Sequence, residues 1–364
     1  MIVNSKLKQK KFLSLINEME NDLHDVFIII RNDVLELIDT AVQKQMSIEE
    51  LEIEIDKLLI SDSSNEINIR QIIDENVSDD KAEEITIVEN SNNNLKQVQK
   101  AKNKYETSYD IARRKERLSK KYSDSWKGKK YEKLISNIIA ENYAKISSKV
   151  LKADKKKFFL NLKTSMPKRN VEKTIVLPPV KEVINKSPTI IKAAEKGKLL
   201  TKTIRDLLKN DIKQTLLSEN ITTKRGYVNK NIQKKLQKKI IETFQNYTER
   251  NKKFQVPNNV RNIAVTESRF IINNIRHEYV KRISNEVKNN FLIKKKWIQN
   301  KSLSKNPRES HTKLHNSRAI LLNEQFNVNG HLAYSPHDIR LPPSETIGCS
   351  CELKYIFVPK NKKN

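Results

Sequence analysis

The sequence predicts a mainly α-helical protein, with an elongated multi-helix body and a small α+β cap at its C-terminal end. Three observations lead to this fold class. Apolar residues recur every three or four positions through long stretches, which is the spacing of a buried helix face. Glycine, which sheet-rich folds use in turns, occurs only 5 times in 364 residues. After Trp297 the helical spacing stops, and partial alternation with turn residues replaces it.

Residues 1–60 form an acidic region that we expect to be helical. Apolar residues within 12–30 are spaced by threes and fours. Ser47 followed by Glu50 has the pattern of a capping box, which predicts that a further helix begins there. Residues 61–94 are acidic and rich in Ser and Asn, and this composition indicates a linker or a loosely held segment.

Residues 95–165 predict a strongly basic helical region. A connector at 166–194 is expected after it, because prolines interrupt helices and favour extended turns. The prolines in or beside this connector are Pro167, Pro178, Pro179 and Pro188. The chain therefore has two candidate boundaries, one on each side of the basic region.

The last region, 195–357, combines helices with a small β-containing end. Its expected amphipathic helices span about 200–216, 228–244 and 258–297. Residues 319–357 alternate in part, and the segment Phe326-Asn327-Val328-Asn329-Gly330 predicts a hairpin turn. This region should supply the cap on the helical body.

Charge is distributed unevenly along the chain, whose formal net charge is +27. Residues 1–100 hold 11 of the 71 Lys and Arg residues but 21 of the 44 Asp and Glu residues. A polyanion partner for the basic remainder is one explanation, because Lys and Arg release condensed counterions from nucleic acid. Solvated helix faces encoded by an AT-rich genome are the other. The acidic first hundred residues argue against codon bias alone, since the same genome encodes both parts.

The densest basic cluster is interleaved with aromatic residues, a combination that nucleic-acid backbone binders use. The candidate DNA-binding residues are Arg113, Arg114, Lys115, Arg117, Lys120, Lys121, Lys129 and Lys130. The interleaved aromatic residues are Tyr105, Tyr109, Tyr122, Trp126 and Tyr131. The alternative is that the aromatic rings pack on neighbouring helices while the basic side chains face solvent.

The sequence contains no apolar stretch near the roughly 20 residues of a membrane span. The N-terminus has basic residues but no apolar signal-peptide core, so we expect a protein that is made in the cytoplasm and not exported by the common secretory route. The two cysteines, Cys349 and Cys351, are two positions apart, and a disulfide between them would be strained. Reduced thiols are therefore expected.

Cys349, Cys351 and His311 form the one metal-like combination in the sequence. Thiolates and imidazoles bind zinc in tetrahedral structural sites, and a metal would stabilise a small, loop-rich chain end. A fourth ligand would come from His315, His331, His337 or Asp338. Because C-x-C is tighter than the usual zinc spacing, two buried thiols beside a hydrogen-bonded histidine are the alternative.

An ordered series of short motifs occupies the last hundred residues. They are Ile263-Ala264-Val265-Thr266-Glu267-Ser268, Trp297, Arg308-Glu309-Ser310-His311, Asn323-Glu324-Gln325-Phe326, Leu332-Ala333-Tyr334-Ser335-Pro336-His337-Asp338 and Ile347-Gly348-Cys349-Ser350-Cys351-Glu352-Leu353. In order and spacing this series resembles the C-terminal domain of the phage Mu F-like minor head proteins, a head-morphogenesis family. The residues that match the family pattern are Thr266, Glu267, Trp297, Arg308, His311, Phe326, Pro336, Cys349 and Cys351. Gly348 and Ser350 replace the family's Asn and Arg beside the cysteines, and Ser335 and His337 alter the turn.

The resemblance, which covers roughly residues 195–355, implies a minor capsid protein rather than an enzyme. Such a protein is placed inside the virion head near the portal vertex, where it contributes to head assembly and to DNA packaging or ejection. The implied partners are the portal protein, other head proteins and the packaged double-stranded DNA. The acidic first hundred residues lie outside the resemblance, and our hypothesis is that they dock on a portal or scaffold surface.

Two other classes of function remain open at this point. A stand-alone nucleic-acid-binding protein would use the basic 95–165 region. An enzyme would be either a transferase acting through Glu267 or a thiol enzyme acting through Cys349 or Cys351. A lone glutamate near a helix start more often serves the helix dipole or an ion pair, and the chain has no glycine-rich phosphate loop. We therefore expect no catalytic residues.

Overall fold

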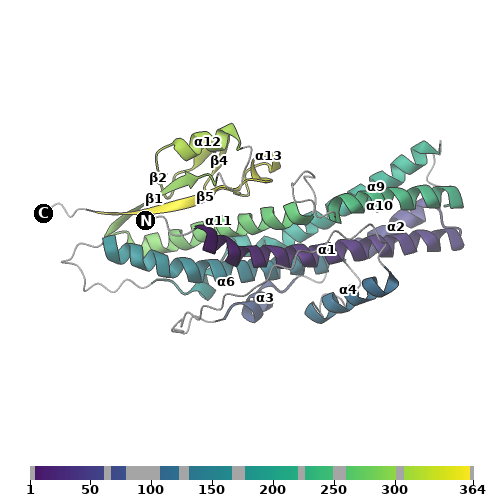
Figure 1. The fold of residues 1–364 in the computed structure, drawn as a ribbon, viewed down its shortest axis with the longest axis horizontal. Coiled ribbons are helices and arrows are strands. Elements are labelled where there is room, and N and C mark those ends of the chain that lie inside the picture. The colour runs from purple at the N-terminus through teal and green to yellow at the C-terminus, as the bar shows by residue number, and fades with distance from the viewer. Residues whose placement is uncertain are drawn as a thin grey trace.

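The computed structural model describes residues 5–60, 67–78, 107–122, 131–165, 177–219, 226–248, 260–300 and 307–360. These residues form an elongated helical body with a small antiparallel sheet docked at one end (Figure 1). The predicted fold class, mainly α with a small α+β C-terminal cap, is confirmed.

Two long helices, α1 (Ser5–Gln43) and α6 (Tyr131–Ser165), form the axis of the body. At 1.5 Å per residue they are about 58 and 52 Å long. They run antiparallel, since the start of α6 contacts Asp33 and its middle contacts Glu18. The apolar side chains between them belong to one continuous hydrophobic core that extends along the body.

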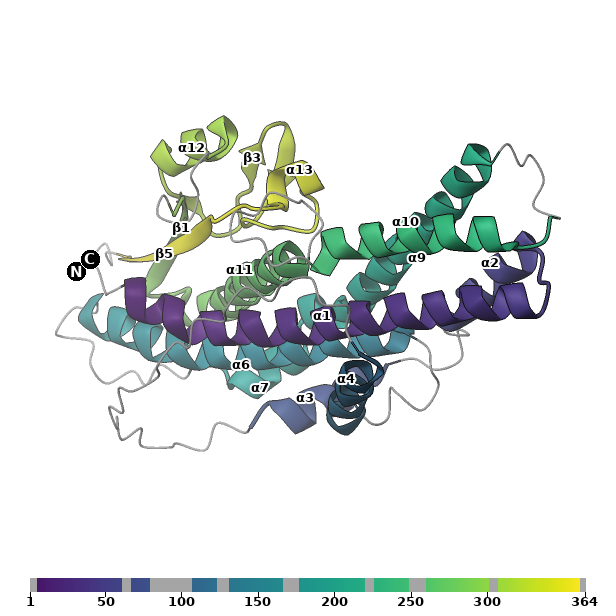
Figure 2. The ribbon, with the colours of Figure 1, turned by 45° about the vertical axis from the view of Figure 1, so that its right-hand side comes forward.

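Further helices complete the body in two halves. In one half, α9 (Ala193–Ser218) packs on α6 and α10 (Lys230–Thr248) packs on α1, which makes a four-helix arrangement. The acidic helix α2 (Ile48–Leu59) lies beside α9, and its predicted capping box is confirmed. In the other half, α11 (Val260–Val287) follows α10 along α1 and also contacts α6 (Figure 2).

Short helices cover the α6 side of the body. They are α3 (Ile69–Asn76), α7 (Val180–Asn185) and α8 (Pro188–Ile191). They lie within 61–94 and 166–194, the segments that the sequence indicated as a linker and a connector. Of the acidic segment, the structure describes 67–78, where Ile73 is buried and α3 packs against α6 and α7. This part of the segment is thus folded onto the body.

The cap contains two small antiparallel sheets and two short helices. Its elements are β1 (Phe291–Ile298), α12 (Glu309–Asn316), β2 (Ile320–Leu321), β3 (Phe326–Val328), β4 (His331–Ala333), α13 (Pro343–Thr346) and β5 (Glu352–Pro359). One sheet has the strand order β2-β1-β5, and the other is the hairpin of β3 and β4. The predicted hairpin turn is confirmed: Asn329 and Gly330 have φ values of 52° and 87°, as a type I′ turn requires.

The expectation of one helix over about 258–297 is wrong at its C-terminal end. The helix ends at Val287, and Phe291–Ile298 form β1, which pairs with β5 along its whole length. Within β1, the side chains of Phe291, Ile293 and Trp297 are buried while intervening ones are more exposed. That is the two-residue period of a strand, and it overrides the helical reading.

Aromatic side chains fix the cap on the helical body. The ring of Phe158 on α6 lies 6.1 Å from those of Tyr279 and Tyr355 and 5.8 Å from that of Phe357. Tyr355 and Phe357 belong to β5, so this cluster joins the sheet to both α6 and α11.

No helix among the described residues is both long and apolar enough to cross a membrane.

Candidate functional site

Five of the nine motif residues of the C-terminal region lie together in one small core inside the cap. Trp297 of β1 is fully buried, and its ring lies edge-on to Phe326 of β3 at 5.3 Å and to His311 of α12 at 5.4 Å. Cys349 and Cys351, just before β5, belong to the same buried cluster as Trp297 and Phe326. Residues that are up to 54 positions apart in the chain, from 297 to 351, are therefore neighbours.

His311, Cys349 and Cys351 form a group that can hold a metal ion. All three are nearly inaccessible to solvent, and their potential ligand atoms lie within 4.8 Å of one another. The His311 Nδ1 atom is 3.5 Å from each sulfur. With Zn–S near 2.3 Å and Zn–N near 2.0–2.1 Å, tetrahedral angles require an S···N distance of about 3.6 Å. The two sulfur–nitrogen distances are thus compatible with a tetrahedral thiolate and imidazole site.

The backbone before β5 turns so that both cysteines face His311. Gly348 has φ +71°, and the Cys349 N–H donates to the Thr346 carbonyl at 3.1 Å. Glycine adopts this left-handed conformation without steric cost. The Cys351 N–H points to the Cys349 sulfur at 3.4 Å.

An outer shell of polar groups holds the imidazole of His311. Its Nε2 atom lies 2.9 Å from the Glu345 carboxylate, which is itself buried on α13. Glu345 accepts hydrogen bonds from Ser310 at 3.3 Å and from Asn329 at 3.4 Å. By distance alone, Glu345 lies where a carboxylate beside a metal-bound histidine is commonly found. Sequence reasoning missed Glu345, because no spacing rule links it to His311.

The expected fourth ligands lie elsewhere or have other partners. The Nδ1 atom of His315 accepts from the Gln299 N–H, His331 is exposed, and Asp338 pairs with Arg340. The buried His337 lies near the cysteines, with its Nε2 atom 3.0 Å from the Cys349 carbonyl oxygen. In the described part of the chain, the group gathers three potential ligands, and His337 is not one of them.

Two side chains of helix α11 form hydrogen bonds with the loop that carries the cysteines. The Arg269 guanidinium donates to the Cys349 carbonyl, and the Asn273 amide donates to the Cys351 carbonyl at 3.2 Å. Burial lowers the pKa of Arg269, while the two nearby thiol groups oppose that shift. Hydrogen bonding between the thiols lowers the pKa of Cys349 and raises that of Cys351.

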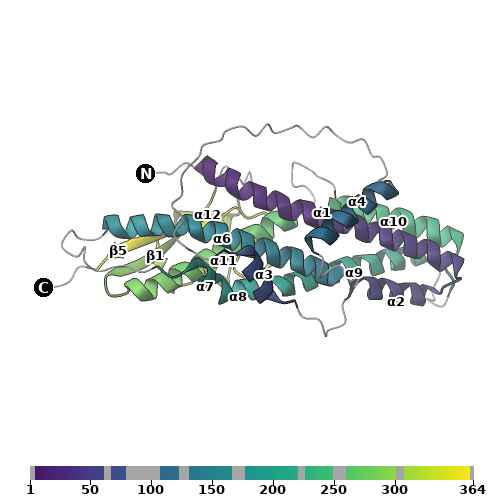
Figure 3. The same cartoon turned by 90° about the horizontal axis from the view of Figure 1, so that it is seen from below.

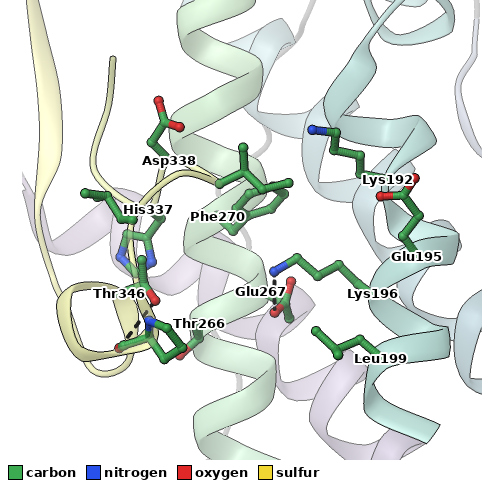
Figure 4. A pocket seen from close by; sticks show the side chains of 13 residues that line it. Lys192, Glu195, Lys196, Leu199, Thr266, Glu267, Phe270, His337, Asp338 and Thr346 are labelled. Atoms are coloured by element: carbon green, nitrogen blue, oxygen red, sulfur yellow. Dashed lines mark hydrogen bonds and ion pairs between the residues drawn. The ribbon is translucent and has the colours of Figure 1, made fainter. Parts of the chain in front are cut away.

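Thr266 and Glu267 lie on α11, outside the cap core, beside a cavity of about 320 Å³ between α9, α11 and the cap (Figure 4). The Glu267 carboxylate accepts from the buried Tyr143 hydroxyl and lies 3.6 Å from the Lys196 ammonium. That ammonium also lies 4.8 Å from the centre of the Phe270 ring. Glu267 therefore has two partners, which tie α11 to α6 and α9.

Arg308 and Pro336 are the remaining motif residues. Arg308 donates to the Ile347 carbonyl at 2.7 Å, and Pro336 is buried in its turn.

Most described members of the basic cluster face carboxylates of α1. They lie on α4 (Ser108–Lys121), which packs against α1 (Figure 3). The pairs are Arg114 with Asp25, Lys115 with Asp33, Arg117 with Asp22 and Asp25, and Lys121 with Glu18 and Asp22. Arg113 is exposed, Lys120 pairs with Glu116 at the surface, and Lys129 and Lys130 lie outside the described residues.

Asp22 and Asp25 are the centre of this α1–α4 interface. Asp22 is fully buried and also accepts from the Tyr122 hydroxyl at 2.7 Å. Burial acts to raise the pKa of Asp25, but a hydrogen bond from His24 and the charges of Arg114 and Arg117 lower it to about 2. The acidic side chains of α1 thus serve a contact within the chain, which composition alone did not indicate.

The cap also contains a buried lysine. Lys295 of β1 is 0% exposed; its ammonium donates to the Tyr334 carbonyl at 2.9 Å and lies 4.9 Å from the centre of the Tyr334 ring. Burial lowers the pKa of Lys295 from 10.5 to about 7. Arg340 adds to this shift, whereas Asp338 and Glu324 oppose it.

We expect Lys295→Met to remove a pH dependence of stability. Between pH 7 and pH 10.5 the unfolded chain keeps the lysine proton and the folded chain does not, so a rising pH favours the folded state. At about 1.4 kcal/mol per pH unit, the native protein should gain about 3 kcal/mol from pH 7 to 9.5 relative to the variant. Urea unfolding of both proteins across this range measures the difference. Parallel curves would show that Lys295 stays charged in the folded state.

Comparison with known protein families, with characterised proteins and with solved structures gives no significant match to this chain.

Proposed function

We propose that this chain is a phage minor head protein of the Mu F-like class, which acts at the portal vertex as a structural component and not as an enzyme. The observation that carries the proposal is the convergence of Trp297, His311, Phe326 and the two cysteines on one buried core. A motif series that is shared through common descent should place its residues in one functional or stabilising cluster. The buried thiols and the doubly partnered Glu267 favour a structural role for these groups over catalysis.

Co-purification with the portal protein tests this function. The tagged full-length chain is expressed together with a portal protein from the same genome, and the eluate is viewed by negative-stain microscopy. The expected result is portal rings decorated by this chain. A matched control is the Trp297→Ala variant, whose cap core lacks its largest side chain. If portal is absent from the eluate and nucleic acid is present, the chain is a stand-alone nucleic-acid-binding protein instead.

The same proposal assigns a structural zinc ion to His311, Cys349 and Cys351. When bound, zinc would tie α12 to the loop before β5 and so stabilise a cap whose own core is small. The outer contact from Glu345 would keep the imidazole in the correct orientation. His337 or a water molecule would complete the tetrahedron.

Protein purified without chelators should contain about one zinc per chain by elemental analysis. Cys351→Ser should lower this content to near zero, because a serine hydroxyl is a poor zinc ligand at neutral pH. Chelation should also change the fluorescence of Trp297, which lies against His311. The control is His331→Ala, which removes an exposed histidine of the same cap and should retain the metal. Native protein without zinc would leave two buried thiols beside a histidine as the correct description.

A further inference from the structure

Helix α10 presents a row of lysines on its outward face. Its exposed basic residues are Lys230, Lys234, Lys235, Lys238 and Lys239, and its one acidic residue is Glu242. The opposite face is buried through Ile232, Leu236, Ile240, Phe244 and Tyr247 and packs on α1 and α9 (Figure 2). The lysines are therefore carried by a helix whose orientation is set by the core.

Lys230, Lys234 and Lys238 are four residues apart and share one stripe of the helix surface. At 1.5 Å per residue, neighbouring lysines are about 6 Å apart along the axis and the stripe is about 12 Å long. One strand of duplex DNA carries a phosphate about every 3.4 Å along its axis, so the stripe spans about three to four phosphates. Flexible lysine side chains can reach phosphates over this distance without a strict register.

The lysines of this stripe, unlike most basic residues of α4, form no ion pair with another described residue. Within the described residues, none of these three lysines has a carboxylate at ion-pair distance, and only their neighbour Lys235 is paired, with Glu219. On α4, by contrast, Arg114 and three other basic residues are bound by α1 carboxylates. The positive charges of α4 are thus largely neutralised within the chain. Lys230, Lys234 and Lys238 of α10, by contrast, have no acidic partner among the described residues.

The side chains around the stripe favour a nucleic-acid backbone over an acidic protein as the partner. Every exposed residue between Lys230 and Lys239 is lysine or asparagine. Protein interfaces are enriched in aromatic residues and depleted in lysine, whereas backbone contacts to DNA need only positive charge and polar groups. We propose that this face of α10 binds the phosphate backbone of double-stranded DNA without sequence preference. The inference rests on the proposed function only in naming packaged DNA as the neighbour.

The experiment measures binding of the purified full-length chain to a fluorescent 30-base-pair duplex of random sequence by anisotropy, over a series of salt concentrations. The variant is Lys230→Gln/Lys234→Gln/Lys238→Gln. Glutamine is as good a helix former as lysine, so the fold should be kept, and circular dichroism checks this. If three phosphate contacts are lost, the slope of log affinity against log salt should fall by about 2 to 3, and affinity should fall at least about tenfold at low salt.

A second variant, Lys281→Gln/Lys288→Gln/Lys354→Gln, removes the same charge from exposed lysines of α11, its C-terminal end and β5. If DNA binding is confined to the α10 face, this variant should keep most of the affinity and nearly the full salt slope. Equal losses in the two variants would mean a diffuse attraction, and no loss in the α10 variant, or no binding by the native chain, would equally overturn the inference. Portal co-purification by the α10 variant separates this outcome from failure of the proposed function, because that assay does not depend on free DNA.

Discussion

Replacing Asp154 by alanine is expected to lower the free energy of unfolding by about 3 to 5 kcal/mol, which is the usual cost of leaving a buried charge without its partner. Asp154 of α6 and Arg276 of α11 are both buried, and the guanidinium donates to the carboxylate through Nε and Nη2. Burial opposes the charge of Arg276, but Asp154 and Glu352 outweigh it and raise the pKa of Arg276. The variant keeps the guanidinium and loses its main counter-charge.

The loss of stability should be large because this ion pair lies where three elements meet. Arg276 also lies 3.6 Å from Glu352 of β5, so the pair connects α6, α11 and the cap at a single point. Urea unfolding monitored by circular dichroism gives the change in free energy. The double variant Asp154→Leu/Arg276→Met should recover most of it, because replacing both charges with apolar groups is often neutral. Glu309→Ala, which breaks the exposed pair with Lys313, should change stability by less than about 0.5 kcal/mol. A small effect of Asp154→Ala alone would mean that water solvates Arg276 in the folded protein.

Periodicity predicted the long helices well because their buried faces repeat over many turns. The expected helix over 228–244 corresponds to α10, which begins two residues later and ends at Thr248, and that over 200–216 lies within α9, which begins several residues earlier, at Ala193. The strand β1 was missed for a physical reason. Its sequence FLIKKKWI places Lys295 at a buried position, and an apolar pattern interrupted by a lysine hides the two-residue period. Strand pairing and the contacts to the Tyr334 carbonyl and ring accommodate that burial.

The candidate metal site was largely predictable, whereas the charge pairing was not. Cysteine and histidine are rare in this chain, with 2 and 6 copies, so their grouping stood out from the composition. Acidic and basic residues are abundant, and the partners in the α1–α4 interface are 82 to 103 positions apart. No short-range pattern selects one pairing among so many charges. The carboxylates of α1 could be recognised as partners of α4 only once the helices were placed in space.

Gly197→Ala is expected to destabilise the helical body although alanine is the better helix former. Gly197 of α9 lies against Ser136 of α6, where a Cβ atom would be 2.4 Å from the Ser136 Cα and 2.1 Å from its hydroxyl oxygen. Contacts this short require the two helices to move apart. Both helices carry small buried residues near the crossing, and Ala140 follows Ser136 by four positions as Gly197 follows Ala193. The close approach is thus built into both surfaces.

The expected change in the free energy of unfolding of Gly197→Ala is the balance of two opposing effects. Alanine at an unconstrained helix position gains about 1 kcal/mol over glycine, while overpacking a rigid interface costs about 1 to 3 kcal/mol or more. Because the clash involves backbone, we expect a net loss of about 2 kcal/mol in urea unfolding. Adding Ser136→Gly removes the Cβ and hydroxyl contacts but leaves the Cα at 2.4 Å, so it should restore only part of the loss. Lys198→Ala, at the next and exposed position of α9, should be near neutral. A Gly197→Ala protein more stable than the native one would show that α6 and α9 can separate freely, and that propensity rather than close packing decides this crossing.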